Sequence, residues 1–357
     1  MDQSAVTAAS AGGWQNQDRS WTEPGAFAVA PGVHRIPLPL PNDALRAVNV
    51  YAVEQGDALV LIDAGWALAE ARARLESALS SLGRELGDVT RFLVTHVHRD
   101  HYTQAVMLRR EFGTRVSLGI GERSSLELSV SGRHVRLENQ VIRLRRAGGG
   151  SVVRALRAAF PAQPTTQIWE LPDDWLSGGG NIALGARSLT IVATPGHTHG
   201  HLCFRDAAGG LLFAGDHVLP HITPSIGFEP VPVSSPLGDY LESLRRVREL
   251  SDTLLLPAHG PVTGSVHARI DELLAHHAAR LDGSRRAIAD GATTAYEVAR
   301  VLTWTSRQKV LDDLDPFNQM LAVLETAAHL DVLVMQDRLR KAADDEIAEY
   351  FVSQPSS

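Results

Sequence analysis

Cysteine is nearly absent from this chain: Cys203 is the only one among 357 residues, so no disulfide can form within it. Long apolar runs are missing too, because no stretch approaches the roughly 18 apolar residues that cross a membrane. Basic residues are not in excess, since 34 Lys and Arg stand against 41 Asp and Glu, a net charge of −7. These absences predict a cytoplasmic protein without a membrane partner, and they argue against nucleic acid as a partner.

What is present is ordinary globular composition. Hydrophobic residues make up 44% and charged residues 21% of the chain, which excludes a disordered or fibrous protein. The length predicts roughly two domains at about 150 residues each. The 15 histidines are clustered rather than spread evenly.

The order of local patterns predicts how the chain is divided. Residues 1–24 are small and polar and predict a flexible tail. Over residues 25–264 short apolar strands alternate with helices, which predicts an α/β domain of two packed sheets with helices outside. An arginine-rich helical insertion is expected at about 122–180. Residues 265–357 carry amphipathic helical patterns with almost no strand signal, which predicts a separate helical domain.

The densest group of candidate metal ligands is His96, His98, Asp100 and His101, directly after a predicted buried strand. On an extended segment His96 and His98 point the same way, whereas Asp100 and His101 converge with them only if the chain then turns. Zinc, iron and manganese all accept imidazole nitrogen and carboxylate oxygen. A polar strand end with surface histidines is the alternative interpretation, and it is disfavoured because three further candidates follow.

Those three candidates repeat the same pattern. His197 lies in TPGHTHGH, Asp216 in FAGD and His259 in LPAHG, each after an apolar run that predicts a strand. Open α/β sheets bear their sites at the carboxyl ends of their strands. The repetition therefore predicts that all these side chains meet at one edge of the sheets.

Together the HxHxDH stretch, the TPGHTxGH stretch, the apolar run ending in GD and the final PAHG resemble the metallo-β-lactamase superfamily over about residues 26–264. The resemblance implies an αββα sandwich, here followed by an all-helical or winged-helix-like C-terminal domain. It implies two divalent metal ions between the sheets, with Zn²⁺ favoured and Mn²⁺ or Fe²⁺ as alternatives.

The resemblance also implies a role for each matching residue. The first metal is expected at His96, His98 and His197, the second at Asp100, His101 and His259, with Asp216 bridging both. Asp63 matches the superfamily's early aspartate, which supports the ligand loops without binding metal. A turn aspartate at a strand end is the alternative reading of Asp63.

Other residues near these motifs are expected outside the ligand set. His199 is expected to face solvent, and His201 to hydrogen-bond behind the ligands. His217 and His221 each either line the pocket or pack. Tyr102 stands where the superfamily commonly has a small residue, so a phenol is expected beside the metals. It either donates to an oxyanion or packs under the loop, the second being favoured.

These expectations define a mechanism. Two divalent ions about 3.5 to 4 Å apart share a water and lower its pKa. We find no G-x-S-x-G elbow and no P-loop. The sequence therefore predicts a binuclear hydrolase that cleaves a thioester, ester or lactone bond of a small molecule. Asp100 is the expected catalytic residue and assists protonation of the leaving group; the 122–180 insertion is expected to hold an apolar acyl group.

Several alternatives stay open. A single-stranded RNA nuclease is the first, because the C-terminal helices resemble the winged-helix-like tail of some superfamily members, although the negative charge argues against it. The others are a mononuclear iron oxygenase of the persulfide dioxygenase type and a non-catalytic effector-binding protein. Antibiotic hydrolysis is disfavoured, since cysteine-ligand β-lactamases have a thiolate at the position of Asp216. The arginines of 133–157 serve a phosphate-bearing substrate or, preferably, form a solvated face. The oligomeric state, a homo-oligomer included, stays open.

Overall fold

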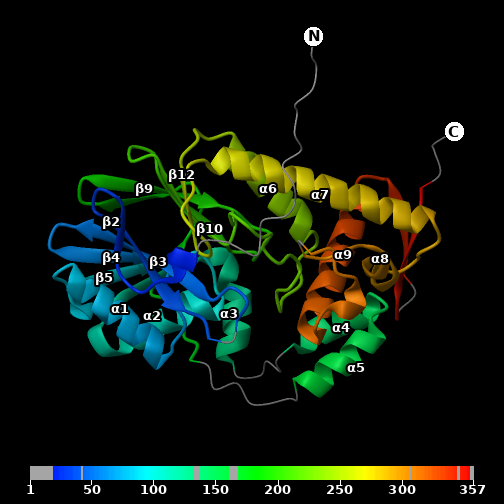
Figure 1. Ribbon diagram of the computed structural model, residues 1–357, viewed down its shortest axis with the longest axis horizontal. Helices are drawn as coiled ribbons and strands as arrows, with labels where there is room; N and C mark the ends of the chain where they lie inside the picture. The colour runs from blue at the N-terminus through cyan, green and yellow to red at the C-terminus, as the bar shows by residue number, and fades with distance from the viewer. Residues whose placement is uncertain are drawn as a thin grey trace, which may run out of the picture.

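The computed structural model describes residues 19–41, 43–131, 137–160, 168–305, 307–343 and 346–353. Its main body is a sandwich of two β-sheets with helices on both outer faces (Figure 1). This confirms the predicted αββα architecture. Among the described residues, no helix combines the length and apolarity needed to cross a bilayer.

The first sheet has seven strands, which follow one another in chain order. They are β1 (Phe27–Ala30), β2 (Val33–Pro39), β3 (Ala47–Gln55), β4 (Ala58–Ile62), β5 (Val89–Leu93), β6 (Arg115–Gly119) and β7 (Asp174–Leu176). From β4 onward the strands run parallel, and parallel neighbours need a crossover. Helices α1 (Ala69–Ser81) and α2 (Arg99–Phe112) supply the first two crossovers. The carboxyl ends of β4, β5 and β6 therefore lie along one edge.

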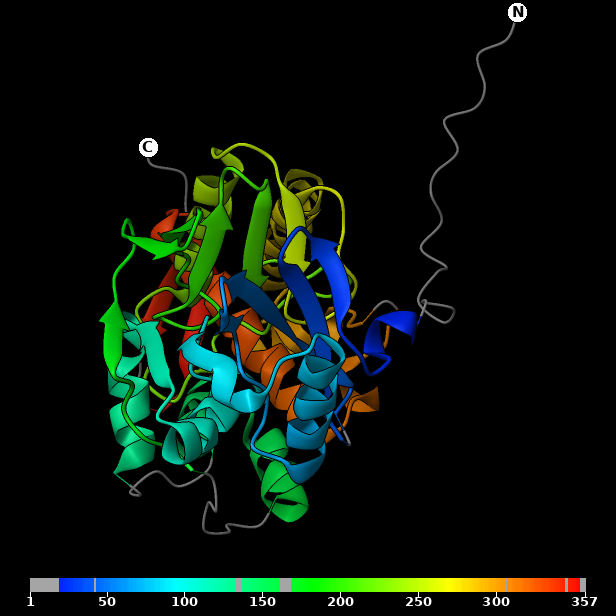
Figure 2. The ribbon, with the colours of Figure 1, turned by 90° about the vertical axis from the view of Figure 1, so that its left-hand side faces the viewer.

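The second sheet has five strands in the order β12-β11-β10-β9-β8. Their bounds are β8 (Asn181–Leu184), β9 (Arg187–Ala193), β10 (Leu202–Asp206), β11 (Leu211–Gly215) and β12 (Leu254–Pro257). Only β11 and β12 pair in parallel, and α6 (Pro236–Arg248) lies between them in the chain. Figure 2 shows the green and yellow strands of this sheet beside the blue strands of the first.

Strand β4 shows how the layers are held. Val60 and Ile62 belong to the apolar cluster between the sheets, whereas Leu59 and Leu61 belong to the cluster beneath α1 and α2. Side chains alternate between the faces of a strand, and here both faces are covered. All four are therefore buried, as expected for a strand buried on both sides.

The C-terminal helices are α7 (Val266–Ala289), α8 (Ala295–Val301) and α9 (Pro316–Met335), followed by a hairpin of β13 (Leu339–Ala343) and β14 (Ala348–Val352). The hairpin favours the winged-helix-like form over the all-helical one. These two strands were not predicted from the sequence because most of β14 is solvent-exposed, with only Tyr350 buried.

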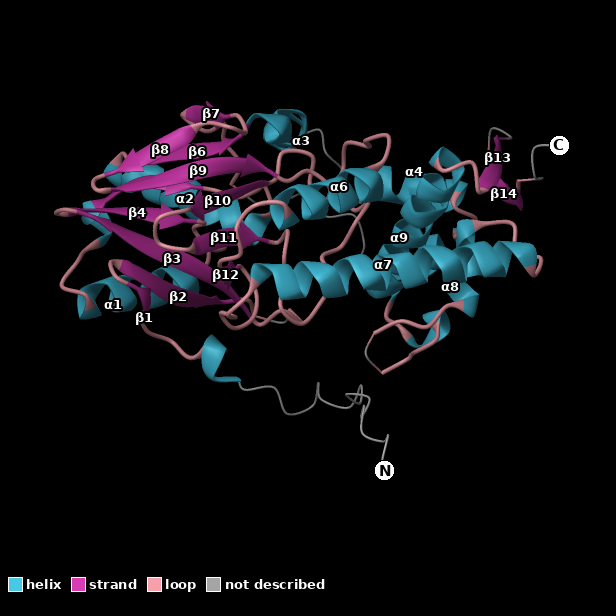
Figure 3. Cartoon of the chain, turned by 90° about the horizontal axis from the view of Figure 1, so that it is seen from above, coloured by secondary structure: helices cyan, strands magenta, loops and turns pink. Residues whose placement is uncertain are grey.

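The predicted insertion contains α3 (Arg123–Val130), α4 (Glu138–Arg146) and α5 (Gly150–Ala159). Helices α4 and α5 pack against α9 and share a hydrophobic core with the C-terminal helices. Figure 3 shows the strands of the sandwich gathered at one end of the molecule, with α4, α7, α8, α9 and the β13–β14 hairpin toward the other. Helices α4 and α5 of the insertion thus lie with the C-terminal helices, whereas β7, near its end, belongs to the first sheet. Two of its arginines, at 133 and 136, lie outside the described residues.

Within the sandwich three strands were not predicted, namely β6, β7 and β8. The predicted N-terminal tail ends in a short 3₁₀ helix, Arg19–Thr22, so regular structure begins earlier than expected. Residues 1–18 of that tail lie outside the described residues.

Candidate metal centre

Each predicted ligand follows the end of a strand, as the sequence pattern indicated. His96 and His98 follow β5, and His98 is the N-cap of α2, so the start of this helix provides the expected turn. His197 follows β9, Asp216 follows β11 and His259 follows β12. The structure brings all of them together. They form one group of His96, His98, His197 and Asp216 and a second of Asp100, His101 and His259.

In the first group three ring nitrogens face one another. The Nδ1 atom of His98 lies 3.0 Å from Nε2 of His96 and 3.1 Å from Nε2 of His197. Burial lowers the pKa of His98 to about 3 and that of His197 to about 4. Burial and the neighbouring imidazoles also lower the pKa of His96 well below its usual value. These rings are therefore neutral at neutral pH.

Hydrogen bonds behind the rings decide which nitrogen has a free lone pair. Nδ1 of His197 donates to the carbonyl of Ser225 at 2.8 Å. Nδ1 of His96 contacts the Thr95 hydroxyl at 3.0 Å, and that hydroxyl donates to a carboxylate. Both Nε2 atoms thus point lone pairs at His98, whose single Nδ1–H could satisfy only one of them. A cation would accept all three, so this donor set fits a metal ion.

The second group also turns its free nitrogens inward. Nδ1 of His259 donates to the Ala47 carbonyl at 2.7 Å, and Nδ1 of His101 contacts Asp63 at 2.9 Å. The Nε2 atoms of both rings are buried without a hydrogen-bond partner among the described residues. The Oδ2 atom of Asp100 lies 3.7 Å from Nε2 of His101 and 3.6 Å from Nε2 of His259.

Excess negative charge surrounds this second group. Burial lowers the pKa of His101, but Asp63, Asp100 and Asp216 outweigh it and raise the pKa to about 10. Burial raises the pKa of Asp100, but His101 and His259 outweigh it and hold the value at about 2. The same carboxylates that raise the pKa of His101 would also attract a cation placed between these side chains. Binding of a divalent cation generally releases protons from its ligands.

Asp216 lies between the two groups. Its Oδ1 is 3.3 Å from Nε2 of His259 and 3.7 Å from Nε2 of His101. Its Oδ2 is 3.5 Å from Nε2 of His197. One carboxylate oxygen therefore faces each group, and Oδ1 has no hydrogen-bond partner among the described residues. This is the arrangement that a bridging ligand requires.

Two further residues hold the ligands from behind. Asp63 accepts from the Thr95 backbone N–H at 2.8 Å as well as contacting His101. His201 Nε2 accepts from the Asp216 backbone N–H at 3.1 Å, and its Nδ1 contacts the Thr194 hydroxyl at 2.8 Å. Both therefore lie where supporting residues were expected.

The expectation for Tyr102 was wrong in its placement beside the metals. Its hydroxyl donates to the Glu170 carbonyl at 2.7 Å, and its fully buried ring stacks on Trp169 with centroids 6.1 Å apart. One step along α2 from His101 turns the side chain by about 100°, into the outer apolar layer. The packing alternative holds.

Of the remaining histidines, His199 is exposed, as expected. His217 is fully buried and packs between the rings of His201 and Tyr240, with centroid distances of 6.0 and 5.3 Å. His221 is only partly buried. Packing is thus the role observed for His217.

Glu122 was not predicted from the sequence: it is a buried carboxyl group whose partners include Thr198, next to His197. Glu122 lies three residues beyond β6, so it follows the same strand-end pattern as the ligands. The signal could have been found if β6 had been predicted.

A third group, His276, His277 and Glu325, lies on α7 and α9. Nδ1 of His277 lies 3.1 Å from Nε2 of His329. This hydrogen bond already occupies the Nδ1 atom of His277. The guanidinium of Arg280 acts on both adjacent histidines and on Glu325, and its positive charge opposes a bound cation. We therefore interpret the group as a polar network that joins α7 to α9.

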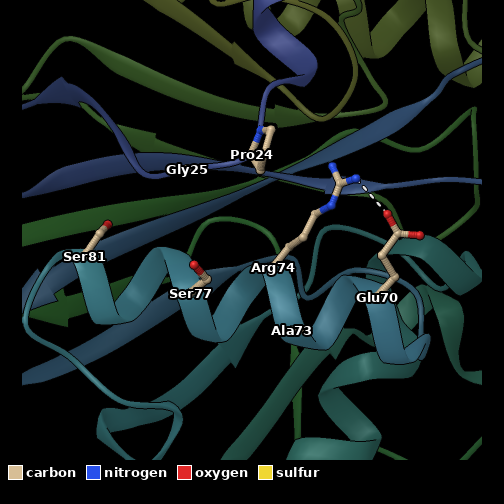
Figure 4. Close-up of a pocket in the computed structure, with 7 residues that line it drawn as sticks. All are labelled: Pro24, Gly25, Glu70, Ala73, Arg74, Ser77 and Ser81. Carbon is tan, nitrogen blue, oxygen red and sulfur yellow. Dashed lines mark hydrogen bonds and ion pairs between the residues drawn. The ribbon is translucent and has the colours of Figure 1, made fainter.

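The pocket drawn in Figure 4 lies along the outer side of α1, away from the candidate ligands, none of which lines it. Its charged side chains, Glu70 and Arg74, pair with each other at 2.7 Å. It therefore offers no free charged group to a ligand.

Comparison with known proteins adds independent support. A family model described as the metallo-beta-lactamase superfamily matches residues 43–259. The chain is 27% identical over 317 residues to the probable metallo-hydrolase YqjP of Bacillus subtilis, covering 85% of this chain and 92% of that protein.

Two solved structures extend the likeness beyond the family model. The metallo-beta-lactamase family protein TTHA1429 from Thermus thermophilus has a TM-score of 0.74 and 27% identity, and the match covers 91% of this chain and all (100%) of that one. A beta-lactamase domain protein from Burkholderia ambifaria has a TM-score of 0.77 and 28% identity, covering 92% and 94%. Coverage this high includes C-terminal helices beyond residue 259.

Proposed function

Because the chain belongs to the metallo-beta-lactamase superfamily and is a metal-dependent hydrolase, we propose that it binds two divalent cations and hydrolyses a thioester, ester or lactone of a small molecule. The observation that carries this proposal is the position of Asp216. One of its oxygens faces each of two groups of buried donors, so a pair of cations would share it.

The donors indicate which ions fit. One group would hold a cation with His96, His98 and His197, and the other with Asp100, His101 and His259. Nitrogen predominates, which favours Zn²⁺, while the carboxylates also suit Mn²⁺ or Fe²⁺. Bound cations would lower the pKa of a water and polarise the substrate carbonyl.

Asp100 is the proposed catalytic residue. Its carboxylate is held in the ionised form with a pKa of about 2 by His101 and His259, against the effect of burial. An ionised carboxylate at this place can accept the proton that the attacking water loses and pass it toward the leaving group. The side chain is 15% exposed, so it retains a path to substrate.

Aromatic side chains beside the first group support an apolar acyl group in the substrate. The ring of Phe228 lies 6.3 Å from that of His98 and 5.6 Å from that of Phe317 on α9. Phe317 in turn lies 6.1 Å from Phe160 after α5. This row favours apolar contact with a substrate, and it would involve both the insertion and the C-terminal helices in substrate choice.

Metal analysis and substrate assays test the proposal together. We expect purified protein to hold two divalent ions per chain, His259→Ala to hold one, and Asp216→Ala to lose both metal and activity. The panel would contain thioesters of increasing acyl length, simple lactones and single-stranded RNA, with exposed His199→Ala as the control. Full activity in protein free of transition-series ions, or cleavage of RNA alone, would overturn the proposal.

A further inference from the structure

A buried carboxyl group outside the two donor groups holds their loops together. Glu122, in the 3₁₀ turn Ile120–Glu122 between β6 and α3, has no exposed surface. The Thr198 hydroxyl donates to its Oε1, and the backbone N–H groups of Val97 and Gly200 also interact with its carboxyl group. Burying a carboxyl group costs free energy unless it has hydrogen-bond partners, and these three contacts supply them.

Those partners lie within the two loops that carry the first donor group. Val97 stands between His96 and His98 in the loop after β5, which we call the first ligand loop (94–98). Thr198 follows His197 directly in the loop after β9, the second ligand loop (194–201). Glu122 therefore contacts both loops at positions adjacent to ligands.

Glycines make this approach sterically feasible. A Cβ at Gly119 would lie 2.1 Å from the Gly200 carbonyl oxygen, and one at Gly121 would lie 2.7 Å from the Gly200 Cα. A Cβ at Gly200 would lie 2.2 Å from the Glu122 nitrogen. The turn after β6 and the second ligand loop thus approach more closely than any residue with a side chain allows.

Glu229 adds a link to the insertion. It is 5% exposed, interacts with the Glu122 carboxyl group and accepts from the His199 backbone N–H, while its carbonyl accepts from Arg143 of α4. Burial raises the pKa of both carboxyl groups. Each has one buried oxygen without a hydrogen-bond partner among the described residues.

We infer that Glu122 is a positioning residue of the metal centre, which holds the first ligand loop against the second so that their ring nitrogens converge on one point. The inference rests on the proposed function, because it assumes that this point takes a cation. The contact that Glu122 would maintain is the one between Nδ1 of His98 and Nε2 of His197, which lie 3.1 Å apart on the two loops.

The second donor group has separate supports, so the effect should be selective. His101 is held by Asp63 and His259 by the Ala47 carbonyl, and neither contact involves Glu122. Loss of a group that orients metal ligands typically costs about 10- to 100-fold in affinity. We therefore expect Glu122→Ala to weaken the first cation by about that factor and leave the second unchanged. A merely structural defect would weaken both.

The experiment titrates metal-free full-length protein with Co²⁺ in competition with a chelating dye, and follows the visible cobalt spectrum. Glu122→Ala should lose affinity at one of two sites and alter the spectrum of that site. Glu122→Gln should bind cobalt almost as tightly as wild type, because the amide oxygen keeps an acceptor for the Thr198 hydroxyl and for the backbone N–H groups of Val97 and Gly200. Glu127→Ala, an exposed carboxylate of the neighbouring helix α3, is the matched control and should match wild type.

The outcomes separate this inference from the proposed function. If wild type binds no cobalt, the proposed function fails. If wild type binds two ions and Glu122→Ala binds both equally tightly, the positioning role is overturned while the proposed function stands. Equal losses in Glu122→Gln and Glu122→Ala would also overturn it. Should Glu122→Ala not fold, Thr198→Val removes one hydroxyl from the same contact and must show the same selective loss.

Discussion

The carboxylate of Asp63 lies 2.9 Å from Nδ1 of His101, a contact between residues 38 positions apart. Asp63 follows the last residue of β4 and adopts a left-handed backbone with φ of 61°. That conformation is uncommon for residues other than glycine, although aspartate and asparagine tolerate it. It places both carboxylate oxygens against Thr95, so Asp63 joins β4, the first ligand loop and α2.

Replacing Asp63 with Ala should therefore release His101 and the first ligand loop together. We expect metal affinity to fall by about 10- to 100-fold and unfolding free energy by about 3 kcal/mol, because a buried charged contact is broken. Metal titration and denaturant unfolding measure the two effects. Asp57→Ala, an exposed aspartate just before β4, is the control. Unchanged metal affinity in Asp63→Ala would contradict the supporting role.

The glycine contact between β6 and the second ligand loop makes a steric prediction. Gly119→Ala should severely reduce bound metal and activity, because its Cβ would lie 2.1 Å from the carbonyl oxygen of Gly200. Only a displacement of the second ligand loop can relieve a clash with its backbone. Gly150→Ala is the matched control, because it begins α5 with nothing within 4 Å of the new Cβ. Metal content and thermal unfolding of both variants test this. Normal metal content in Gly119→Ala would show that the loop moves freely.

Buried His329 predicts a stability change in mild acid. Burial lowers its pKa to about 3, below the value of about 6.5 in an unfolded chain. Below about pH 6.5 this histidine thus takes up a proton in the unfolded chain but stays neutral in the folded protein. The neutral histidine therefore contributes fully to the free energy of unfolding above about pH 6.5. That contribution is lost as the pH falls toward the pKa of His329 in the folded protein, by about 1.4 kcal/mol per pH unit.

His329→Gln should make stability less dependent on pH over that window. The measurement is denaturant unfolding between about pH 7 and pH 5, with chelator present so that metal release does not contribute. Exposed His199→Gln serves as the control and should retain the wild-type slope. An identical slope in His329→Gln would mean that this histidine does not contribute to the acid sensitivity.

The aromatic row next to His98 predicts a specificity change. Phe228→Ala should lower kcat/KM for a long-chain thioester about ten-fold, because it removes one apolar contact with the acyl chain. The same variant should lower kcat/KM for an acetyl thioester less, because that substrate has almost no acyl chain. Phe112→Ala, which removes an exposed ring at the end of α2, should change neither. Steady-state kinetics across acyl lengths gives the comparison, and an equal loss for short and long chains would place Phe228 outside the acyl site.

Local patterns were sufficient for most of the sandwich and for the candidate ligands. An apolar strand followed by His or Asp predicted the meeting of His197, Asp216 and His259 with the first ligand loop, because strand ends share an edge. Strand β6 was missed, and with it Glu122. The hairpin of β13 and β14 was missed because most of β14 is exposed, with only Tyr350 buried. The placement of Tyr102 depended on the rotation of α2, which no local pattern specifies.

The sequence alone determined which side chains can bind a cation and which strands they follow, because donor atoms and side-chain alternation are local properties. Tertiary structure alone decided which nitrogen of each histidine faces inward, how Asp216 comes between the groups, and that Glu122 joins two loops. Those facts depend on contacts between residues as far apart as Glu122 and Thr198, and such contacts exist only once the strands are ordered and packed.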